Sequence, residues 1–480
     1  MAFEPGDLTW TDAVGQAQLV RDGQASAAEL VEAAIGRIER VNPQINAVIH
    51  ERFERARAEA AGELPEGPFT GVPILLKDLA CESEGDPYHC GTRFLKELAW
   101  RSDHDTAFVG RLRRAGFVIV GRTNTPEFGS TITTEPEAYG PARNPWNLDH
   151  STGGSSGGSG AAVAAGLVPA GHGNDGGGSI RIPASECGIV GLKPTRARVS
   201  QAPDVGSVWN GGTIDGILTR TVRDTAAILD VMAGGEPGDP YPAPPLARPL
   251  REEVGADPGS LRVGVMNRPG MAGLPADSDC MAAADAGGAL LEELGHKVEA
   301  AHPLALEDDE FAVRFGDIVA VSLAADLDEW SAKIGRPVVE GDIESGNWVF
   351  AEMGRALSSS QYEGSVRWMH AYQRRVAQWW ADDGFDVLVT PVLNGPPPPI
   401  GWLTDSAEGG WRLLQMMAYT AQFNMTGQPA ISLPLHWTDS GLPVGVQLVA
   451  AFGREDVLVR VASQIEAARP WAHRVPPVHA

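Results

Sequence analysis

A glycine-rich stretch in the first half of the chain restricts the possible folds more than any other feature. Residues 151–179 contain 11 glycines and 5 serines and are followed directly by Ile-Arg-Ile-Pro-Ala. Such a composition is typical of a flexible linker, but two Gly/Ser clusters flank an apolar segment, 161–170, that is able to pack. Because glycine lets backbone N–H groups approach a ligand or a developing oxyanion, two glycine loops joined by a packed element also indicate a functional site.

The composition limits the kinds of partner and cellular location. A chain of 480 residues, 43% of them apolar, is able to bury one large core or two. Its formal charge of −24 argues against binding to nucleic acid or to anionic membranes, whose phosphates would repel it. The four cysteines show no C-x-x-C spacing, so we expect no metal site and no disulfide framework. Residues 1–10 lack the features of a signal peptide, and we expect a cytoplasmic protein without a membrane span or cofactor.

Alternating helical and strand patterns predict an α/β fold with a central mixed sheet covered by helices on both sides. Ser26 and Glu29 form a capping box for a helix that Asn42-Pro43 should end. The other expected elements are helices over about 46–62 and 105–115, strands at 72–79, 117–121, 386–391, 430–433 and 444–449, a Pro-rich connector over 233–260, and a mostly helical stretch over 300–380.

The first glycine cluster fits a hydrolase motif only superficially. Residues 153–157 match G-x-S-x-G, the nucleophile elbow of α/β-hydrolases, which requires a hydrophobic strand immediately before it. Residues 143–150, Arg-Asn-Pro-Trp-Asn-Leu-Asp-His, are turn-like instead. No G-K-[ST] follows the glycines, and the chain contains no S-x-x-K, so neither a P-loop nor a penicillin-binding motif is present.

The second cluster is better placed for a nucleophile. In 175–183, three glycines precede Ser179 and form a turn whose successive N–H groups are able to face a developing oxyanion. A short helix over about 157–166 and a strand over 167–172 would bring Ser155 and Ser179 together. A serine in such a loop is more often a turn former than a catalytic residue, so a second chemical group is needed to decide.

Lys77 is that group, because it lies inside the apolar run 72–79. A lysine there either extends its ammonium to water, the commoner case, or is desolvated. Desolvation would lower its pKa toward neutrality and produce an amine that accepts a proton. Asp78 alternates to the opposite face of a strand and is not automatically its ion-pair partner.

Three motifs resemble the amidase signature family. They are G-V-P-x-x-x-K-D at 71–78, G-G-S-S-G-G-S at 153–159 and D-x-G-G-S-I-R-x-P-A at 175–184. They follow the family's order, with 78 residues from Lys77 to Ser155 and 24 from Ser155 to Ser179. Segments 121–129, 423–436 and 441–451 are also similar to the family, so the resemblance covers nearly the whole chain.

The resemblance implies a catalytic triad. Ser179 would be the nucleophile, Ser155 a relay serine that follows a cis peptide bond, and Lys77 the base. Asp175 and Arg181 would brace the nucleophile loop. Ser156 is a further supporting residue, and the expected oxyanion-hole donors are the backbone N–H groups of Gly176, Gly177, Gly178 and Ser179.

The resemblance also implies the organisation of the chain. We expect one amidase-signature domain over 1–480, with a catalytic core at about 65–230 and 380–470. The mostly helical region at about 300–380 would vary among members and shape the substrate pocket. The family further suggests a homodimer.

Within the family, several segments are similar to the 6-aminohexanoate cyclic-dimer hydrolases of nylon-oligomer degradation. These are Asn174-Asp175, 133–138, 143–147 and 191–195. That group has a pocket cysteine in mid-chain, whereas here no cysteine follows Cys280 and the corresponding stretch, 315–319, is mostly apolar. An apolar pocket suits anilides and aryl carbamates as well as nylon-like amides. Two alternatives remain: the glutaminase subunit of a tRNA-dependent amidotransferase, and a non-catalytic binding protein on the same scaffold.

Overall fold

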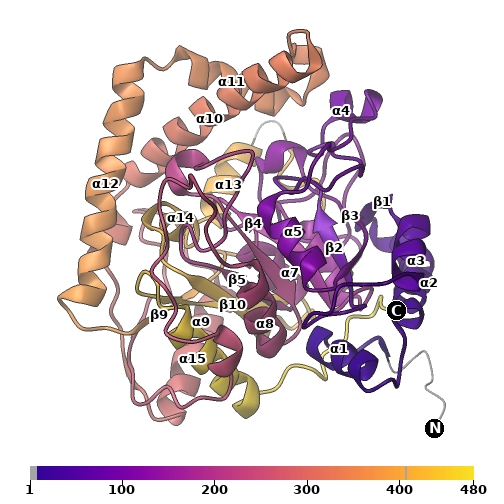
Figure 1. The fold of residues 1–480 in the computed structure, drawn as a ribbon. Helices are drawn as coiled ribbons and strands as arrows, with labels where there is room; N and C mark the ends of the chain where they lie inside the picture. The colour runs from indigo at the N-terminus through magenta and orange to yellow at the C-terminus, as the bar shows by residue number, and fades with distance from the viewer. Residues whose placement is uncertain (1–7, 406–407) are drawn as a thin grey trace.

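A single mixed β-sheet forms the centre of the molecule (Figure 1). The computed structural model describes residues 8–405 and 408–480, and within them the sheet has 11 strands in the order β1-β3-β2-β4-β6-β5-β10-β11-β9-β7-β8. The strands are β1 (Val48–Glu51), β2 (Pro73–Lys77), β3 (Val118–Thr123), β4 (Ala170–Asp175), β5 (Val190–Lys193), β6 (Ile214–Thr219), β7 (Arg262–Val265), β8 (Lys297–Glu299), β9 (Val387–Pro391), β10 (Ala430–Trp437) and β11 (Pro443–Ala450). Strand β2 runs parallel to both of its neighbours, β3 and β4.

Helices connect and cover these strands. They are α1 (Ala13–Arg21), α2 (Ala27–Ile45), α3 (Phe53–Ala61), α4 (Arg93–Glu97), α5 (Ala107–Arg114), α6 (Gly157–Ala164), α7 (Arg181–Cys187), α8 (Val222–Met232), α9 (Ser278–Glu293), α10 (Glu310–Ile334), α11 (Ser345–Ala356), α12 (Ser359–Ala381), α13 (Gly409–Met416), α14 (Ala421–Thr426) and α15 (Glu455–Ala468). The capping box of Ser26 and Glu29 begins α2 as predicted. The predicted helices near 105–115 and 157–166 correspond to α5 and α6.

The two faces of the sheet are both buried, as residue alternation along β2 demonstrates. Ile74 and Leu76 belong to a core cluster with side chains of α1, α5, α8, α9 and α15. Leu75 belongs to a second cluster with side chains of α2, α3, α6 and α7. Because successive strand residues point to opposite faces, Lys77 lies on the same face as Leu75, toward α6 and α7. The predicted sheet with helices on both sides is confirmed.

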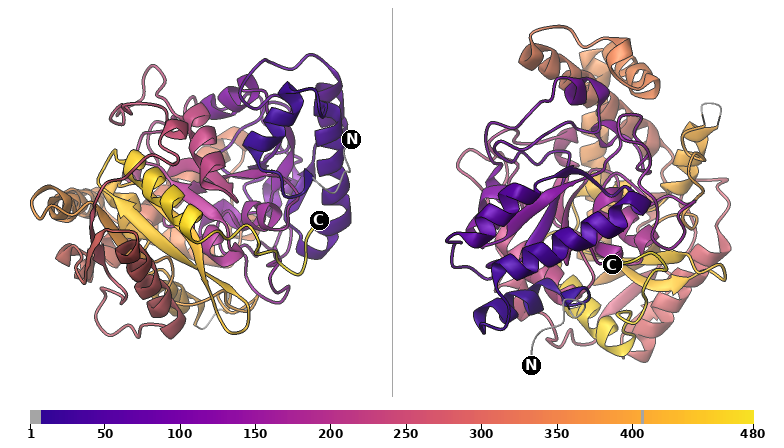
Figure 2. Two further views of the ribbon diagram at one scale, coloured as in Figure 1. Left: turned by 90° about the horizontal axis from the view of Figure 1, so that it is seen from below. Right: turned by 90° about the vertical axis from the view of Figure 1, so that its right-hand side faces the viewer.

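The stretch predicted to be mostly helical forms α10, α11 and α12, which lie at the periphery of the molecule (Figures 1 and 2). Phe311 and Ile318 of α10 pack with α12 and with Leu388 of β9. Further along α10, Leu327 and Trp330 pack against side chains of the β2–α5 connection. Helix α10 therefore links the sheet to the long loop that follows Lys77.

Three local predictions were wrong or displaced. Helix α2 continues to Ile45 with Pro43 inside it, because a proline near the helix end removes few hydrogen bonds and the Asn42 carboxamide accepts the N–H groups of Ala47 and Val48. Residues 46–62 are not one helix, since the first part pairs with β3 as β1. Strand β4 begins three residues later than predicted and therefore carries Asn174 and Asp175.

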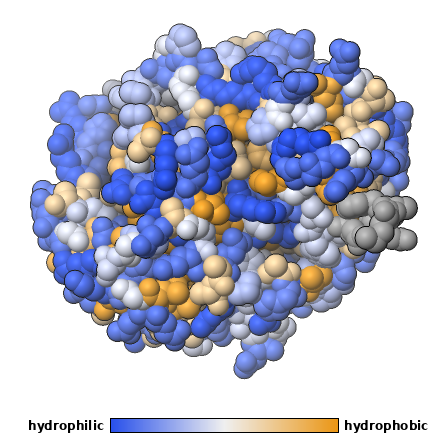
Figure 3. Space-filling model, turned by 60° about the horizontal axis from the view of Figure 1, so that its bottom comes forward, coloured by the Kyte–Doolittle hydropathy of each residue, from blue (hydrophilic) through white to orange (hydrophobic). Residues whose placement is uncertain are grey.

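The face drawn in Figure 3 is mostly hydrophilic, with apolar residues interspersed. Across residues 8–405 and 408–480, no helix combines the length and the apolar character needed to cross a bilayer. The C-terminal segment returns to the N-terminal helices, where the rings of Trp10 and His479 lie 5.8 Å apart (Figure 1).

Candidate active site

Lys77 lies at the carboxyl end of β2 and is fully buried. Its Nζ is 2.6 Å from Ser155 Oγ and 2.5 Å from Asn174 Oδ1. Burial lowers the pKa of Lys77 to about 7, although the nearby carboxylates of Asp215 and Asp175 act in the opposite direction. Of the two possibilities for this lysine, the desolvated one holds, and the amine is available as a proton acceptor near neutral pH.

Asn174 determines how Lys77 is held, and the sequence did not identify it as a site residue. Its Nδ2 donates to the carbonyl oxygen of Leu79 at 2.9 Å, so that Oδ1 faces the amine. A neutral lysine is then able to donate one N–H to Asn174 while its lone pair faces the hydroxyl of Ser155. The position of Asn174, one residue before Asp175 on β4, was the available signal.

The first glycine cluster forms a tight turn before α6. The Gly154–Ser155 peptide bond is cis, and Gly153 adopts a φ of +71°. A side chain at Gly154 would lie only 2.5 Å from the carbonyl oxygen of Thr133, so the turn requires glycine there. The hydroxyl of Ser156 donates to the carbonyl oxygen of Asn174, and the backbone N–H of Ser156 donates to the carbonyl oxygen of Ser179. Ser156 thus joins the two serine-bearing loops.

The second cluster connects β4 to α7 and is braced from beneath by a buried ion pair. Arg181 binds both carboxylate oxygens of Asp175, at 2.8 and 2.9 Å. Despite burial, the Arg181 charge holds the pKa of Asp175 well below its usual range. Asn424 and Gln447 accept further guanidinium N–H groups at 2.6 and 2.7 Å. The bracing expected of Asp175 and Arg181 is present, and it extends to α14 and β11.

The same carboxylate requires a correction to the expected oxyanion hole. Asp175 Oδ1 accepts the N–H of Gly178 at 2.7 Å, so that group is already engaged. Gly178 instead serves the turn with a φ of +136°. Among the described residues, no acceptor is hydrogen-bonded to the N–H of Gly176, Gly177 or Ser179. These three remain as the candidate donors.

Ser179 lies where two cavities meet. One, of about 420 Å³, is largely apolar and is lined by Phe311, Phe315 and Val319 of α10. The other, of about 180 Å³, is lined by Ser155, Asn174 and polar side chains from several elements. Gly129, Ser179 and Trp209 line both. The apolar stretch 315–319 therefore contributes to a pocket at the nucleophile candidate.

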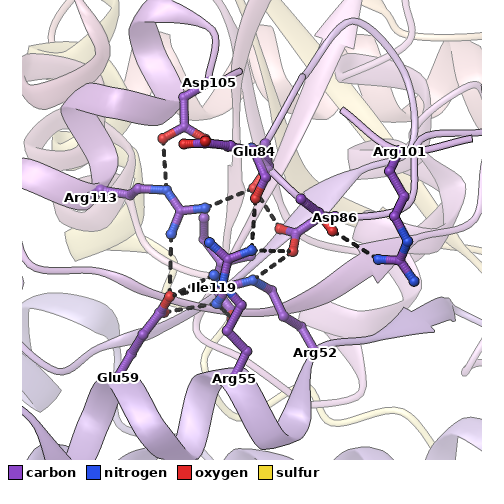
Figure 4. Close-up of polar contacts among 11 residues, drawn as sticks. Arg52, Arg55, Glu59, Glu84, Asp86, Arg101, Asp105, Arg113 and Ile119 are labelled. Carbon is purple, nitrogen blue, oxygen red and sulfur yellow. Dashed lines mark hydrogen bonds and ion pairs between the residues drawn. The ribbon is translucent and has the colours of Figure 1, made fainter. Parts of the chain in front are cut away.

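The loop between β2 and α5, which forms one wall of the smaller cavity, is anchored by a network of ion pairs (Figure 4). Arg52, between β1 and α3, binds Asp86 of the loop at 2.9 Å and Glu59 of α3 at 2.6 Å. Arg113 of α5 binds Asp105 of the loop at 2.9 Å. Because Arg52 and Asp86 are both buried, this network fixes the path of the chain beyond Lys77.

The remaining titratable residues do not gather into a metal site. In the part of the chain that the structure describes, no group of three or more His, Cys, Asp or Glu is arranged to hold a metal ion. His172 is buried and pairs with Asp215 at 3.1 Å. Cys187 is fully buried in the core beside α6.

Comparison with known proteins identifies the family of the chain. Residues 29–459 match the model of the family described as Amidase. The 6-aminohexanoate-cyclic-dimer hydrolase of Paenarthrobacter ureafaciens is 48% identical over 479 residues, which cover 97% of this chain and 96% of the relative. A solved 6-aminohexanoate cyclic dimer hydrolase complexed with substrate matches with a TM-score of 0.95 at 46% identity, covering 98% of this chain and 100% of the other.

A bacterial aryl acylamidase of the amidase signature family matches with a TM-score of 0.88 at 26% identity, covering 98% of this chain and 99% of the other. The resemblance inferred from three sequence motifs is confirmed by these matches, and so is the fold that it implied. The chain belongs to the amidase signature family and is an amide hydrolase.

Proposed function

We propose that this amidase cleaves the C–N bond through an acyl-enzyme, with Ser179 as nucleophile, Ser155 as proton relay and Lys77 as base. The observation that carries the proposal is the contact of 2.6 Å between Lys77 Nζ and Ser155 Oγ beside a cavity that Ser179 also lines. A buried amine with a pKa of about 7 next to a hydroxyl is the arrangement that activates a serine near neutral pH.

In the acylation step, Ser179 Oγ forms a bond to the amide carbon and transfers its proton to Ser155 Oγ. Ser155 passes its own proton to neutral Lys77, which becomes an ammonium. The carbonyl oxygen takes the negative charge and is stabilised by the N–H groups of Gly177 and Ser179, with Gly176 as a third candidate donor. Loss of one such donor costs about 3–4 kcal/mol in comparable sites.

Collapse of the tetrahedral intermediate breaks the C–N bond. The proton returns from Lys77 through Ser155 to the nitrogen, which leaves as an amine. Water then attacks the ester of Ser179 and loses its proton through the same relay. Release of the carboxylic acid restores the Ser179 hydroxyl and neutral Lys77, so that one amide and one water yield one acid and one amine.

The substrate class follows from the relatives and from the apolar cavity. The relatives carry names of nylon-oligomer and aryl-amide hydrolases. A cavity of about 420 Å³ with aromatic walls from α10 would accept the apolar acyl part of a nylon-like amide, an anilide or an aryl carbamate. In this proposal the helical region over 300–380 shapes the substrate pocket of one domain, in a cytoplasmic enzyme that forms a homodimer.

A substrate panel tests the proposal. It contains an anilide, an aryl carbamate, linear and cyclic 6-aminohexanoate dimers, and glutamine, with Ser179→Ala as the control. We expect hydrolysis of at least one of the first four and none by the variant. Ammonia release from glutamine alone would favour the amidotransferase alternative. An inactive wild-type protein that still binds the amides would support the non-catalytic alternative.

A further inference from the structure

The smaller cavity at Ser179 has an acidic wall that the proposed mechanism does not use. Four carboxylate side chains and one lysine line it, namely Glu82, Asp204, Asp326, Glu329 and Lys333. Glu82 comes from the loop after β2, whereas Asp326, Glu329 and Lys333 come from α10. The carboxylates therefore converge from separate elements on one cavity.

Two of the four carboxylates already have counter-charges. Lys333 Nζ lies 2.9 Å from Glu329 and within 5.0 Å of the ring centre of Trp330. His104 Nε2 lies 2.9 Å from Asp204. These pairs are half-exposed and lie toward the solvent.

The other two carboxylates form no ion pair among the described residues, although the charges of Arg122 and His104 act on Glu82 and that of Lys333 acts on Asp326. Glu82 is only 7% exposed, and its Oε2 is buried with no hydrogen-bond partner among the described residues. The side chain of Asp326 makes no hydrogen bond or ion pair to any residue within 8–405 or 408–480. Burial, with the nearby Glu329 charge, raises the pKa of Asp326 to about 7, and burial also raises that of Glu82. A cation between these groups would relieve their desolvation and repulsion.

The cavity also has the aromatic surface that favours an ammonium group. Tyr88, Phe128, Trp209 and Trp330 line it together with the carboxylates. Aromatic faces attract cations, and the position of Lys333 against Trp330 is an example inside this cavity.

The proposed chemistry determines which half of the substrate occupies the smaller cavity. Ser155 and Ser179 both line the smaller cavity, whereas Ser179 but not Ser155 lines the apolar cavity. The leaving nitrogen must approach Ser155 to receive its proton. The amine half of the amide therefore extends into the acidic cavity, and the acyl half into the apolar one.

We propose that the smaller cavity is an amine-side subsite for amides whose amine half ends in a positive charge, that is, mono-N-acylated diamines, with Glu82 and Asp326 as counter-charges. This inference rests on the proposed function. It also implies that an amine half ending in a carboxylate, as in the linear dimer of 6-aminohexanoate, is disfavoured by repulsion.

Three substrates with five-carbon amine halves test this: N-hexanoyl amides of 1,5-diaminopentane, of pentylamine and of 5-aminopentanoic acid. We expect kcat/KM to be about tenfold higher for the diamine amide than for the neutral one, and lowest for the carboxylate. Glu82→Gln and Asp326→Asn should each reduce the preference for the diamine amide several-fold while changing the rate on the neutral amide less.

One further variant tests the direction of the charge effect, and another serves as the control. Lys333→Gln removes a competing cation and should increase the preference for the diamine amide. Asp328→Asn, which removes an exposed acid elsewhere on α10, should leave the preference unchanged. Equal rates on the three amides, or a preference that Glu82→Gln and Asp326→Asn do not alter, would overturn the subsite while leaving the amidase proposal intact. Failure to hydrolyse any amide of either panel would overturn the proposed function itself.

Discussion

Two strands of the sheet end in a fully buried lysine, and the two sites have very different chemistry. Lys77 ends β2 and Lys193 ends β5. Burial lowers the pKa of both to about 7. By burial and pKa alone, either lysine is suited to act as a general base.

Their hydrogen-bond partners distinguish them. Lys77 faces the hydroxyl of Ser155, which has a proton to give, at the edge of a cavity. Lys193 donates to the carbonyl oxygen of Pro194 at 2.9 Å, and a carbonyl has no proton to transfer. A perturbed pKa therefore indicates a catalytic residue only together with a proton-donating neighbour and space for a substrate.

The largest expected effect is on amide hydrolysis after removal of each amine. Lys77→Met should lower kcat/KM by at least about a thousandfold, because the relay loses its proton acceptor. Lys193→Met should change it by less than about threefold. Steady-state kinetics on one amide, with circular dichroism to confirm folding, measures both. Equal losses in the two variants would remove the distinction between the lysines.

The pH dependence provides the next test. Only neutral Lys77 accepts the proton, so kcat/KM should fall about tenfold per pH unit below pH 7 and be constant above it until another group titrates. The acid limb should be present in wild type and in Lys193→Met alike. If the acid limb moved in Lys193→Met, the group that titrates in it would be Lys193 and not Lys77.

Asn174→Asp should shift that limb without removing any member of the triad. A carboxylate in place of the Asn174 amide stabilises the ammonium form and raises the pKa of Lys77. We expect the acid limb to move to higher pH and kcat/KM at pH 7 to fall about tenfold. Activity measured at pH 9 should recover most of this loss. A uniform loss at every pH would indicate that Asn174 has only a structural role.

The smallest effect is on stability, and here the two lysines should behave alike. Between pH 7 and about 10, each lysine is protonated in the unfolded chain but neutral in the folded protein. Uptake of a proton on unfolding therefore stabilises the unfolded state in this pH range. Both methionine variants should therefore gain a few degrees in Tm relative to wild type at pH 7. The gain should diminish as pH rises toward about 10, the unfolded lysine pKa. Thermal denaturation at several pH values checks this; a gain that grows with pH would contradict it.

Much of the fold followed from local patterns. The strands around Lys77 and near 117–121 and 444–449 were predicted because they are apolar runs bounded by turns, and the helices of 300–380 because of their composition. The predicted helix over 46–62 is confirmed only in its second half, α3, because β1 exists only through its pairing with β3, a contact between segments far apart in the sequence.

The candidate site was inferred from sequence motifs, and the catalytic roles of its residues stay predictions. Three motifs identified Lys77, Ser155 and Ser179, and the structure brings Lys77 into contact with Ser155. The sequence did not reveal that Asn174 holds the amine, that Gly178 is engaged by Asp175, or that Asp326 of α10 faces the same cavity as Glu82. Each of these depends on side-chain directions set by packing between distant segments.

The most direct test of the central claim is the rate and position of labelling by a fluorophosphonate, followed by mass spectrometry of the peptides. We expect one labelled residue, Ser179, in wild type and Lys193→Met, at a rate that rises with pH through about 7. Lys77→Met should be labelled at least about a hundredfold more slowly. Labelling of another residue, or an unchanged rate in Lys77→Met, would contradict the account.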